Sequence, residues 1–266
     1  MEKPGLSRAE EAVGSLLREA GAIALRELAH LRPERKSDGS VVTAADRLCE
    51  AHLVEGLSAL FPNDAVVGEE GASTSGSSGA TWYVDPLDGT AAYVEGLAYW
   101  GPTVCRVVEG RYDAGWLYLP RLDEMYLAKR GGGAWCNGAR LRAGDAPVDG
   151  DASICLPSRF HRRMPLPWPG RVRAVGSTAA HLALVASGSA IATVIPSFQP
   201  WDVGCGFLLV SEAGRRVETA EGHLVEGPET GSHLPVLAGA PTALRVLRGR
   251  LRRKPAAAQG EQQTTE

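Results

Sequence analysis

The chain has 266 residues, of which 44% are hydrophobic and 22% charged, and its formal net charge is −3. This length is sufficient for one large domain, or two closely packed subdomains, with a full hydrophobic core. The balanced charge and the lack of a basic stripe interleaved with aromatic residues argue against nucleic-acid binding. The sequence contains no run of about 18 consecutive apolar residues, the length that a membrane span would need.

The first sixty residues predict two helices. Ser7 and Glu10 have the spacing of a capping box and are followed by apolar residues at a helical period. Thr43 and Asp46 have the same spacing ahead of a second helix, which should end near Leu60 because Pro62 follows. The Gly/Ser-rich segment 71–80 lacks apolar periodicity, so we expect a mobile loop there.

The apolar run 82–84 predicts a buried strand, and the hexamer DPLDGT (85–90) follows it. We expect Pro86 to end the strand and Gly89 to free the backbone, so that Asp85 and Asp88 face one space. Two carboxylates held that close repel each other unless a hard cation lies between them. An acidic turn without a ligand is the alternative, because Asp-Gly turns are common.

The rest of the chain divides into two parts with different predicted patterns of secondary structure. Strand-like runs separated by turn residues at 103–108, 112–118, 124–129 and 134–136 predict an antiparallel meander. Beyond residue 150 strands alternate with helices: strands at 172–175, 190–195 and 236–238, and helices at 177–185, 202–212 and from Pro241 onward. We therefore expect an α/β (α+β) fold with a meander-rich subdomain at 1–150, an α/β subdomain at 151–254 and a disordered tail at 255–266.

The five cysteines are odd in number and scattered, without C-x-x-C spacing, at positions 49, 105, 136, 155 and 205. This pattern argues against a disulfide framework or a zinc site and favours a reducing compartment. The N-terminus leads into an amphipathic stretch rather than a signal peptide. We therefore expect a cytoplasmic protein.

Three further acids occur where structural elements begin or end. Glu69 follows the apolar run 65–67 in the motif GEE (68–70), and Asp202 lies in the first turn of a helix in WDVG (201–204). Asp46 lies at the start of the second helix. Each acid has a purely structural alternative: Asp202 would complement a helix dipole, Asp46 would cap its helix, and Glu69 would be a solvated loop acid.

Taken together, these motifs resemble the inositol monophosphatase family of magnesium-dependent, lithium-sensitive phosphatases. The matching pieces are GEE, DPLDGT, WDVG and EAG (212–214), supported by KSDGSVVTAAD (36–46) and CNGARL (136–141). They occur in family order and at family-like spacing over about residues 1–250. The resemblance implies a layered α/β/α/β/α sandwich of the inositol monophosphatase/fructose-1,6-bisphosphatase type, which is usually a homodimer.

The resemblance also implies two or three Mg²⁺ ions. Their ligands would be oxygen atoms of Glu69, Asp85, Asp88 and Asp202 and the backbone carbonyl of Leu87. These are hard donors of the kind that Mg²⁺ prefers. Glu70 is expected to act in catalysis from outside this ligand set.

Thr90 and Asp46 complete the implied catalytic machinery. Thr90 would hydrogen-bond the attacking water and Asp46 would orient Thr90, so that the carboxylate acts as a base through the hydroxyl. The backbone N–H groups of Gly89 and Thr90 would meet phosphate oxygens.

The substrate is less well defined than the reaction. Gly176, Ser177 and Thr178 match a family segment that lines the substrate pocket. Inositol-specific members carry a glutamate seven residues before the helix aspartate, where this chain has Ile195, and an apolar residue cannot replace the hydrogen bond to a ring hydroxyl. The expected activity is hydrolysis of a small phosphorylated metabolite, a polyol or sugar-like phosphate.

Other activities of the same class remain open, as does a non-enzymatic role. The stretch 36–46 looks like the histidinol-phosphate and nucleotide-bisphosphate branches, although Ala91 stands where the nucleotidases commonly have lysine. Histidinol-phosphate phosphatase is therefore the first alternative, followed by 3′(2′),5′-bisphosphate nucleotidase and fructose-1,6-bisphosphatase. A catalytically silent regulator that binds metal or phosphate is the alternative from another class. We also expect His181 to be a packed or capping residue, and Arg215 and Arg216 to be surface residues.

Overall fold

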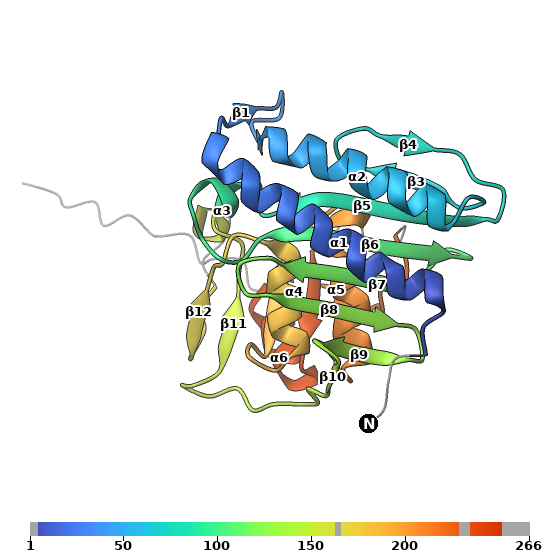
Figure 1. The fold of residues 1–266 in the computed structure, drawn as a ribbon. Helices are drawn as coiled ribbons and strands as arrows, with labels where there is room; N and C mark the ends of the chain where they lie inside the picture. The colour runs from blue at the N-terminus through green and yellow to red at the C-terminus, as the bar shows by residue number, and fades with distance from the viewer. Residues whose placement is uncertain (1–4, 163–165, 229–234, 252–266) are drawn as a thin grey trace, which may run out of the picture.

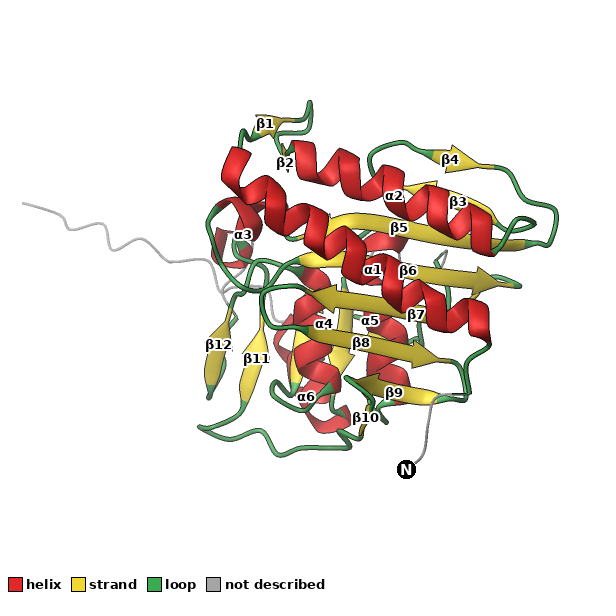
Figure 2. Cartoon of the chain, in the orientation of Figure 1, coloured by secondary structure: helices red, strands yellow, loops and turns green. Residues whose placement is uncertain are grey.

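Five layers of secondary structure stack on one another in the computed structural model, which describes residues 5–162, 166–228 and 235–251 (Figure 1). The layers alternate between helices and sheets, as the colouring of Figure 2 shows. This is the α/β/α/β/α sandwich that the sequence predicted. The expected tail, 255–266, lies outside the described residues.

The first layer consists of helices α1 (Arg8–Glu27) and α2 (Ala44–Leu60), which lie across one face of the larger sheet. Both begin with the predicted capping boxes: Ser7 N donates to Glu10 Oε2 at 2.7 Å, and Thr43 N donates to Asp46 Oδ2 at 2.7 Å. The connection between the helices contains the 3₁₀ turn η1 (Leu28–His30) and a small hairpin of β1 (Glu34–Arg35) and β2 (Val41–Val42).

The larger sheet has eight strands in the order β10-β9-β8-β7-β6-β5-β3-β4. Their bounds are β3 (Ala65–Gly68), β4 (Ser73–Thr74), β5 (Ala80–Asp88), β6 (Gly101–Val108), β7 (Arg111–Leu119), β8 (Glu124–Lys129), β9 (Gly133–Cys136) and β10 (Ala139–Leu141). The predicted meander is confirmed, because the strands from β5 to β10 pair in antiparallel order. Strand β3 joins the sheet parallel to β5.

Pro86 does not end strand β5, contrary to the prediction. Asp85 pairs with Thr103 and Asp88 pairs with Gly101, with a register shift between them, so the strand runs through Pro86 as a bulge. A bulge leaves one residue out of the ladder and so tolerates a proline that has no N–H to donate. It is therefore the bulge that sets the directions of Asp85 and Asp88.

The Gly/Ser-rich segment 71–80 has more regular structure than the sequence predicted. Strand β4 within it pairs with β3 at the edge of the sheet. Farther along, the N–H groups of Ser77 and Ser78 donate to the carbonyl of Asn63 at 2.7 and 2.9 Å. The segment is therefore tied to the molecule on both sides.

The smaller sheet has five strands in the order β12-β11-β13-β15-β14. Their bounds are β11 (Ser153–Cys155), β12 (Arg171–Arg173), β13 (Ala192–Ile195), β14 (Arg216–Thr219) and β15 (Val236–Gly239). The predicted strands at 172–175, 190–195 and 236–238 are present with shifted ends, whereas β11 and β14 were missed. The 3₁₀ turn η2 (Phe160–Arg162) follows β11.

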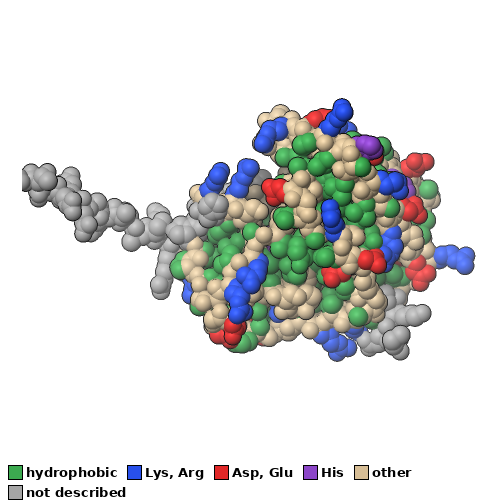
Figure 3. Space-filling model, turned by 60° about the vertical axis from the view of Figure 1, so that its left-hand side comes forward, with side chains coloured by type: hydrophobic (Ala, Val, Ile, Leu, Met, Phe, Trp, Pro, Cys, Tyr) green, Lys and Arg blue, Asp and Glu red, His purple; other side chains and the backbone are tan. Residues whose placement is uncertain are grey.

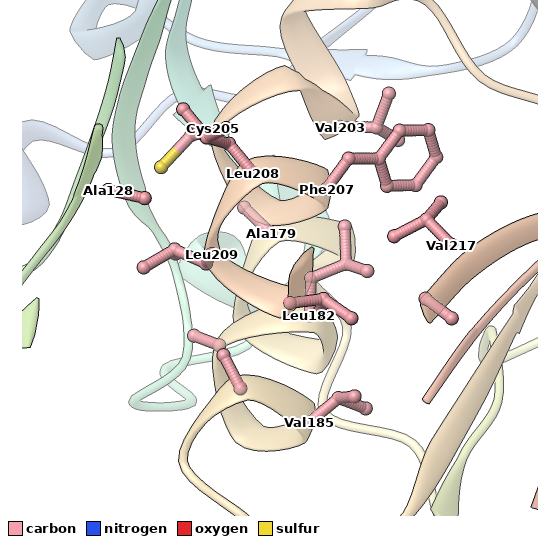
Figure 4. Close-up of a cluster of buried hydrophobic side chains, with 14 of the residues drawn as sticks. Ala128, Ala179, Leu182, Val185, Val203, Cys205, Phe207, Leu208, Leu209 and Val217 are labelled. Carbon is pink, nitrogen blue, oxygen red and sulfur yellow. The ribbon is translucent and has the colours of Figure 1, made fainter. Parts of the chain in front are cut away.

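Helices α4 (Thr178–Ala186) and α5 (Pro200–Glu212) form the middle layer, and α6 (Pro241–Leu251) covers the outer face of the smaller sheet. Figure 4 shows the apolar contact in the middle layer, where Leu182 of α4 lies close to Leu209 and Phe207 of α5, and Val185 belongs to the same apolar cluster farther along α4. Because both helices are enclosed by sheets, they are apolar around most of their circumference.

Helix α5 approaches the larger sheet very closely at its first turn. A Cβ added at Gly204 would lie 2.1 Å from Cys105 Sγ of β6, a distance that atoms do not reach. Only glycine therefore allows the helix to pack there. The close approach brings Asp202, two residues earlier, against the strands that carry the DPLDGT motif.

Arg215 is buried, although we expected a surface residue. Its guanidinium donates to the carbonyls of Gly144 at 3.0 Å and Val185 at 2.7 Å, and also to the carbonyl of Ala190. Three carbonyl dipoles, two of them from the end of α4 and the turn after it, replace the solvation that the buried cation loses. Its neighbour Arg216 is exposed, as predicted.

On the face shown in Figure 3, acidic and basic side chains are interspersed with apolar ones. Within the described residues, no helix combines the length and the apolar composition that crossing a membrane requires.

Candidate metal centre and adjoining cavity

Three of the predicted ligands meet at one point. Glu69 follows the end of β3, Asp85 lies in β5, and Asp202 lies in the first turn of α5. One carboxylate oxygen from each lies within 4.8 Å of those of the other two. Acids that are up to 133 positions apart in sequence (202 − 69) are thereby brought together by two strands and a helix.

Backbone contacts fix each of these three residues. The N–H of Glu69 donates to the carbonyl of Val84 at 3.0 Å, which ties the end of β3 to β5. Asp85 Oδ1 accepts from the N–H of Leu87 at 2.8 Å, and Asp202 Oδ2 accepts from the N–H of Gln199 at 2.8 Å. The cluster is therefore held in place by the ends of its own elements.

Burial and the repulsion of neighbouring carboxylates raise the pKa values of Asp85 and Asp202. Asp85 is only 2% exposed, and its burial, followed by the charges of Glu69, Asp88 and Asp202, raises its pKa well above the usual value. Burial, with smaller contributions from Asp88 and Glu69, raises the pKa of Asp202 to about 7. A divalent cation would remove this repulsion, and carboxylate oxygens suit Mg²⁺. The donor set therefore fits the metal that the sequence implied.

Lys36 lies beside the cluster and was given no role by the sequence. Its Nζ is 2.9 Å from Glu69 Oε1 and 2.6 Å from Glu70 Oε1. Burial would lower the pKa of Lys36, but its hydrogen bonds to Glu70 and Glu69 and their charges outweigh burial and raise it. Glu70 is thus held by Lys36 outside the group of three acids, where the prediction placed it.

Asp88, the fourth predicted carboxylate ligand, lies outside this group. Its carboxylate accepts a short hydrogen bond from the hydroxyl of Ser177, and further bonds from the N–H groups of Ala179 at 2.7 Å and Thr178 at 3.3 Å. Burial raises the pKa of Asp88 to about 6, and these donors oppose that rise. Asp88 therefore connects the bulge of β5 to the first turn of α4.

Thr90 and Asp46 are in direct contact, as the sequence predicted. Thr90 Oγ1 lies 2.8 Å from Asp46 Oδ1 and 3.1 Å from the carbonyl oxygen of Leu87. Asp46 also accepts from the N–H and the hydroxyl of Thr43, so it both caps α2 and contacts Thr90. Burial raises the pKa of Asp46, and the hydrogen bonds from Thr43 and Thr90 oppose that rise.

Gly89 gives the chain its turn between β5 and the short helix α3 (Thr90–Val94). Its φ of +91° lies in the left-handed region that favours glycine. The buried carbonyl of Leu87 and the hydroxyl of Thr90 consequently face each other across one turn.

Glu50 is a functional candidate that the sequence reasoning missed. It lies four residues after Asp46 on α2 and is buried. Its carboxylate accepts from the N–H of Glu70 at 2.7 Å and from that of Ala72 at 2.9 Å. The sequence contained a signal for it, because Glu50 follows Asp46 by four positions and residues four apart share one face of a helix. Gly68 makes room for this acid, since a Cβ there would lie 2.4 Å from Glu50 Oε2.

A cavity of about 160 Å³ adjoins the acids at the N-terminal end of α4. Thr178 and Ile195, both predicted to contact substrate, line it together with His181. Ser177 caps α4 through a hydrogen bond from the N–H of Ala180 at 3.0 Å. Gly176, with a φ of +90°, turns the chain into the helix.

His181 is packed, as predicted. It is buried in α4, and its Nε2 accepts from the N–H of Val175 at 3.0 Å.

Residues 6–254 match the sequence model of the inositol monophosphatase family. The chain belongs to this family. The match covers both the acidic cluster and the cavity, and it assigns the chain to the phosphatases that hydrolyse phosphoric monoesters. The predicted family, fold class and reaction class are confirmed.

Relatives within and around the family carry more than one substrate name. The chain is 33% identical over 188 residues to a histidinol-phosphatase of Chlorobaculum parvum, which covers 67% of this chain and 72% of that protein. It is 30% identical over 220 residues to a fructose-1,6-bisphosphatase/inositol-1-monophosphatase of Thermotoga maritima, covering 78% and 83%. The crystal structure of the extragenic suppressor protein suhB from Bartonella henselae superposes with a TM-score of 0.81 at 28% identity, covering 93% of this chain and 99% of that one.

Proposed function

We propose that this chain is a Mg²⁺-dependent phosphomonoesterase that hydrolyses a small phosphorylated metabolite, a polyol or sugar-like phosphate. The observation that carries the proposal is the meeting of Glu69, Asp85 and Asp202 at one partly buried point. Uncompensated, three carboxylates so close together are unfavourable, and a divalent ion would relieve that repulsion.

The metal would be held by the acidic cluster. Glu69, Asp85 and Asp202 would provide carboxylate oxygens, and the carbonyl of Leu87 and the carboxylate of Asp88 would complete two or three sites. When bound there, Mg²⁺ offsets the charge of the phosphate and acidifies water. Lys36 would keep Glu69 and Glu70 in place as the metal binds, since it contacts both acids.

Thr90 and Asp46 would position the attacking water. Because the hydroxyl of Thr90 donates to Asp46, its oxygen lone pairs can accept a hydrogen bond from a water molecule. As that water attacks phosphorus and the P–O bond to the alcohol breaks, its proton would pass to Thr90 Oγ1 while the Thr90 proton passes to Asp46 Oδ1. The leaving alkoxide would take a proton from solvent water and depart as the alcohol. The raised pKa of Asp46 suits this role, because it makes the carboxylate a better proton acceptor.

The phosphate and the leaving alcohol would lie on opposite sides of Asp88. The N–H groups of Gly89 and Thr90 would bind phosphate oxygens. Ser177 and Thr178, which contact Asp88, would direct the alcohol toward the cavity next to Ile195.

The substrate is the open part of the proposal. The relatives are named for histidinol phosphate, fructose 1,6-bisphosphate and inositol 1-phosphate. Ile195 is buried and lines the cavity, so it cannot supply the hydrogen bond that a polyol ring would need at that position. Histidinol-phosphate phosphatase is the first alternative, then 3′(2′),5′-bisphosphate nucleotidase or fructose-1,6-bisphosphatase. A silent metal- or phosphate-binding regulator is the non-enzymatic one.

Assembly and location belong to the same proposal. We propose a homodimer, on the family resemblance, and a cytoplasmic location, supported by five cysteines that are all free and mostly buried. Light scattering after size-exclusion chromatography would test the dimer, and a monomer at micromolar concentration would contradict it.

Phosphate release with Mg²⁺, and then with EDTA, tests the activity. The substrates are inositol 1-phosphate, histidinol phosphate, fructose 1,6-bisphosphate, adenosine 3′,5′-bisphosphate and glycerol 2-phosphate. We expect one clearly preferred substrate and loss of release with EDTA. Release that persists in EDTA would contradict the metal assignment. If no substrate is hydrolysed while calorimetry still detects Mg²⁺ binding, the regulator alternative is favoured.

A further inference from the structure

The cavity beside α4 lies where the alcohol part of a substrate would fall, an inference that rests on the proposed function. Thr178 lines the cavity, and its N–H donates to Asp88 at 3.3 Å. The remaining lining comes from His181, from Pro157, Arg159 and Phe160, and from residues 194–197 at the end of β13 and just after it. A substrate group that binds in the cavity would therefore be joined to the scissile phosphate by a short chain of atoms.

His181 offers a hydrogen-bond donor to this cavity. Its ring is only 4% exposed, and Nε2 already accepts from the N–H of Val175. Burial lowers the pKa of His181 to about 4, so near neutral pH the ring is uncharged and its single proton is on Nδ1. Within the described residues no group accepts from Nδ1, and this atom is not among the fully enclosed polar atoms that lack a partner, so it can donate into the cavity that His181 lines. A ligand acceptor would satisfy it.

Arg159 adds a positive charge at the rim. Its side chain is exposed and lines the cavity, and it forms no ion pair with any residue that the structure describes. Guanidinium groups bind phosphate and carboxylate through two parallel hydrogen bonds. The rim is therefore suited to an anion.

The other lining residues disfavour a positively charged ligand group. Among the described residues of the lining none carries a carboxylate, and Phe160, Val194 and Ile195 form apolar walls. An ammonium group, as in histidinol phosphate, would be desolvated there without a carboxylate counter-ion, which is costly.

We propose that the cavity formed by Arg159, His181 and Ile195 recognises a second anionic group, a phosphate or a carboxylate, carried on the alcohol part of the substrate. The scissile phosphate lies at the acidic cluster, the short carbon skeleton lies against Ile195, and the second anion meets Arg159 and the Nδ1–H of His181. Selection would thus favour doubly anionic monoesters over neutral or cationic ones.

Two matched pairs of substrates test the inference. Fructose 1,6-bisphosphate differs from fructose 1-phosphate by a second phosphate, and 3-phosphoglycerate differs from glycerol 3-phosphate by a carboxylate. We expect kcat/KM to be at least about tenfold higher for one doubly anionic member than for its partner, mainly through KM. A higher kcat/KM in the fructose pair would identify the second anion as a phosphate, and a higher kcat/KM in the glycerol pair would identify it as a carboxylate.

Variants connect this preference to the two residues. Arg159→Gln should lower the preference ratio by about tenfold, which corresponds to about 1.4 kcal/mol. Arg162→Gln is the matched control, because Arg162 is an exposed arginine in η2, the 3₁₀ turn that directly follows Arg159, and it does not line the cavity. His181→Phe should also lower the ratio. His181→Gln should restore it, because an amide can accept from the N–H of Val175 and still donate to the ligand.

The opposite results would overturn the inference. Ratios near one for both pairs, equal ratios in Arg159→Gln and Arg162→Gln, or a preference for histidinol phosphate would each refute it. If no ester is hydrolysed, including p-nitrophenyl phosphate, the proposed function fails by itself. Calorimetry with fructose 1,6-bisphosphate and fructose 1-phosphate then decides on the cavity: tighter bisphosphate binding that Arg159→Gln abolishes supports it, and equal binding refutes it.

Discussion

The hydroxyl of Thr90 lies 2.8 Å from Oδ1 of Asp46, although 44 positions separate the two residues in sequence. The other oxygen of Asp46 accepts from the N–H and hydroxyl of Thr43, at 2.7 and 2.6 Å. The N-terminus of α2 thus orients a hydroxyl at the start of α3. The carboxylate of Asp46 is therefore both the cap of α2 and the candidate catalytic base.

Replacing Thr90 tests whether this contact positions the attacking water. Thr90→Ala should lower kcat by about a hundredfold, because the hydroxyl that links water to Asp46 is removed. Thr90→Ser keeps the hydroxyl and should retain most of the activity. Steady-state kinetics at saturating Mg²⁺ measures both, and an unchanged kcat in Thr90→Ala would remove Thr90 from the mechanism.

Glu50 should control how tightly the metal binds, without being a ligand. It holds the backbone of Glu70 and Ala72, immediately after the proposed ligand Glu69. Glu50→Gln replaces one acceptor oxygen by an NH₂ group and so frees one of these N–H groups. We expect the Mg²⁺ concentration for half-maximal activity to rise by about tenfold or more.

The control for Glu50 is Glu55→Gln, an exposed acid on the same helix. It should leave the Mg²⁺ dependence of activity as it is. If Glu50→Gln and Glu55→Gln give the same Mg²⁺ titration, Glu50 has only a general role in stability.

Local signals in the sequence predicted much of the fold. The capping pairs Ser7–Glu10 and Thr43–Asp46 involve residues three positions apart, so the sequence shows them directly. The meander is equally local, because its strands pair with their neighbours. Strand β14 was missed because it begins at an exposed arginine and has a glutamate at its centre, so its apolar pattern is weak.

The features that were wrong or missing depend on distant partners. Pro86 lies inside a strand because β6 pairs with β5 on both sides of the bulge. Arg215 is buried because Gly144 and the end of α4 with its following turn, both distant in sequence, present carbonyl groups to it. In the site, the motifs named three acids that the structure brings together, but the contact between Asp88 and the first turn of α4 depends on tertiary packing. No short-range pattern contains that information.

Asp85→Asn separates the metal role of the cluster from its effect on stability. The amide oxygen of asparagine can still accept from the N–H of Leu87, and the substitution removes one of three repelling charges. We expect turnover to be lost while the Tm measured in EDTA stays equal or rises. Mg²⁺ should raise the Tm of the wild type and not that of the variant, because only a ligand that binds the folded state stabilises it.

The control for Asp85 is Glu95→Gln, which removes an exposed carboxylate just after α3. It should behave as the wild type in calorimetric melts with and without Mg²⁺. Activity of Asp85→Asn close to the wild-type level would contradict its assignment as a ligand.

Gly204 should be intolerant of any side chain. A Cβ there would lie 2.1 Å from Cys105 Sγ, so α5 would have to move away from β6. Gly204→Ala should lower the free energy of unfolding by about 1–3 kcal/mol and reduce activity, because the shift displaces Asp202. Gly14→Ala in α1 is the control, since a Cβ there meets open space and should stabilise the helix by about 0.5–1 kcal/mol. Urea unfolding compares the two, and equal stabilities would contradict the close packing.

Asp64 should contribute to stability in acid. Its carboxylate accepts from Ser78 Oγ at 2.6 Å, Arg106 Nε at 2.8 Å and Trp82 Nε1 at 3.0 Å. Burial by itself would raise the pKa of Asp64, but the hydrogen bonds from Arg106, Ser78 and Trp82 and the charge of Arg106 outweigh it and hold the pKa below its ordinary value of 3.8. As the pH falls, the unfolded chain therefore binds a proton before the folded one does, so this stabilisation is complete above about pH 4 and is lost as the pH falls through the lowered pKa.

Asp64→Asn should be less stable at neutral pH and should lose less stability on acidification, as measured by urea unfolding at several pH values. Asp151→Asn, which removes an exposed partner of Arg171, should keep the wild-type acid dependence, and an identical dependence in Asp64→Asn would show that this buried carboxylate does not set it.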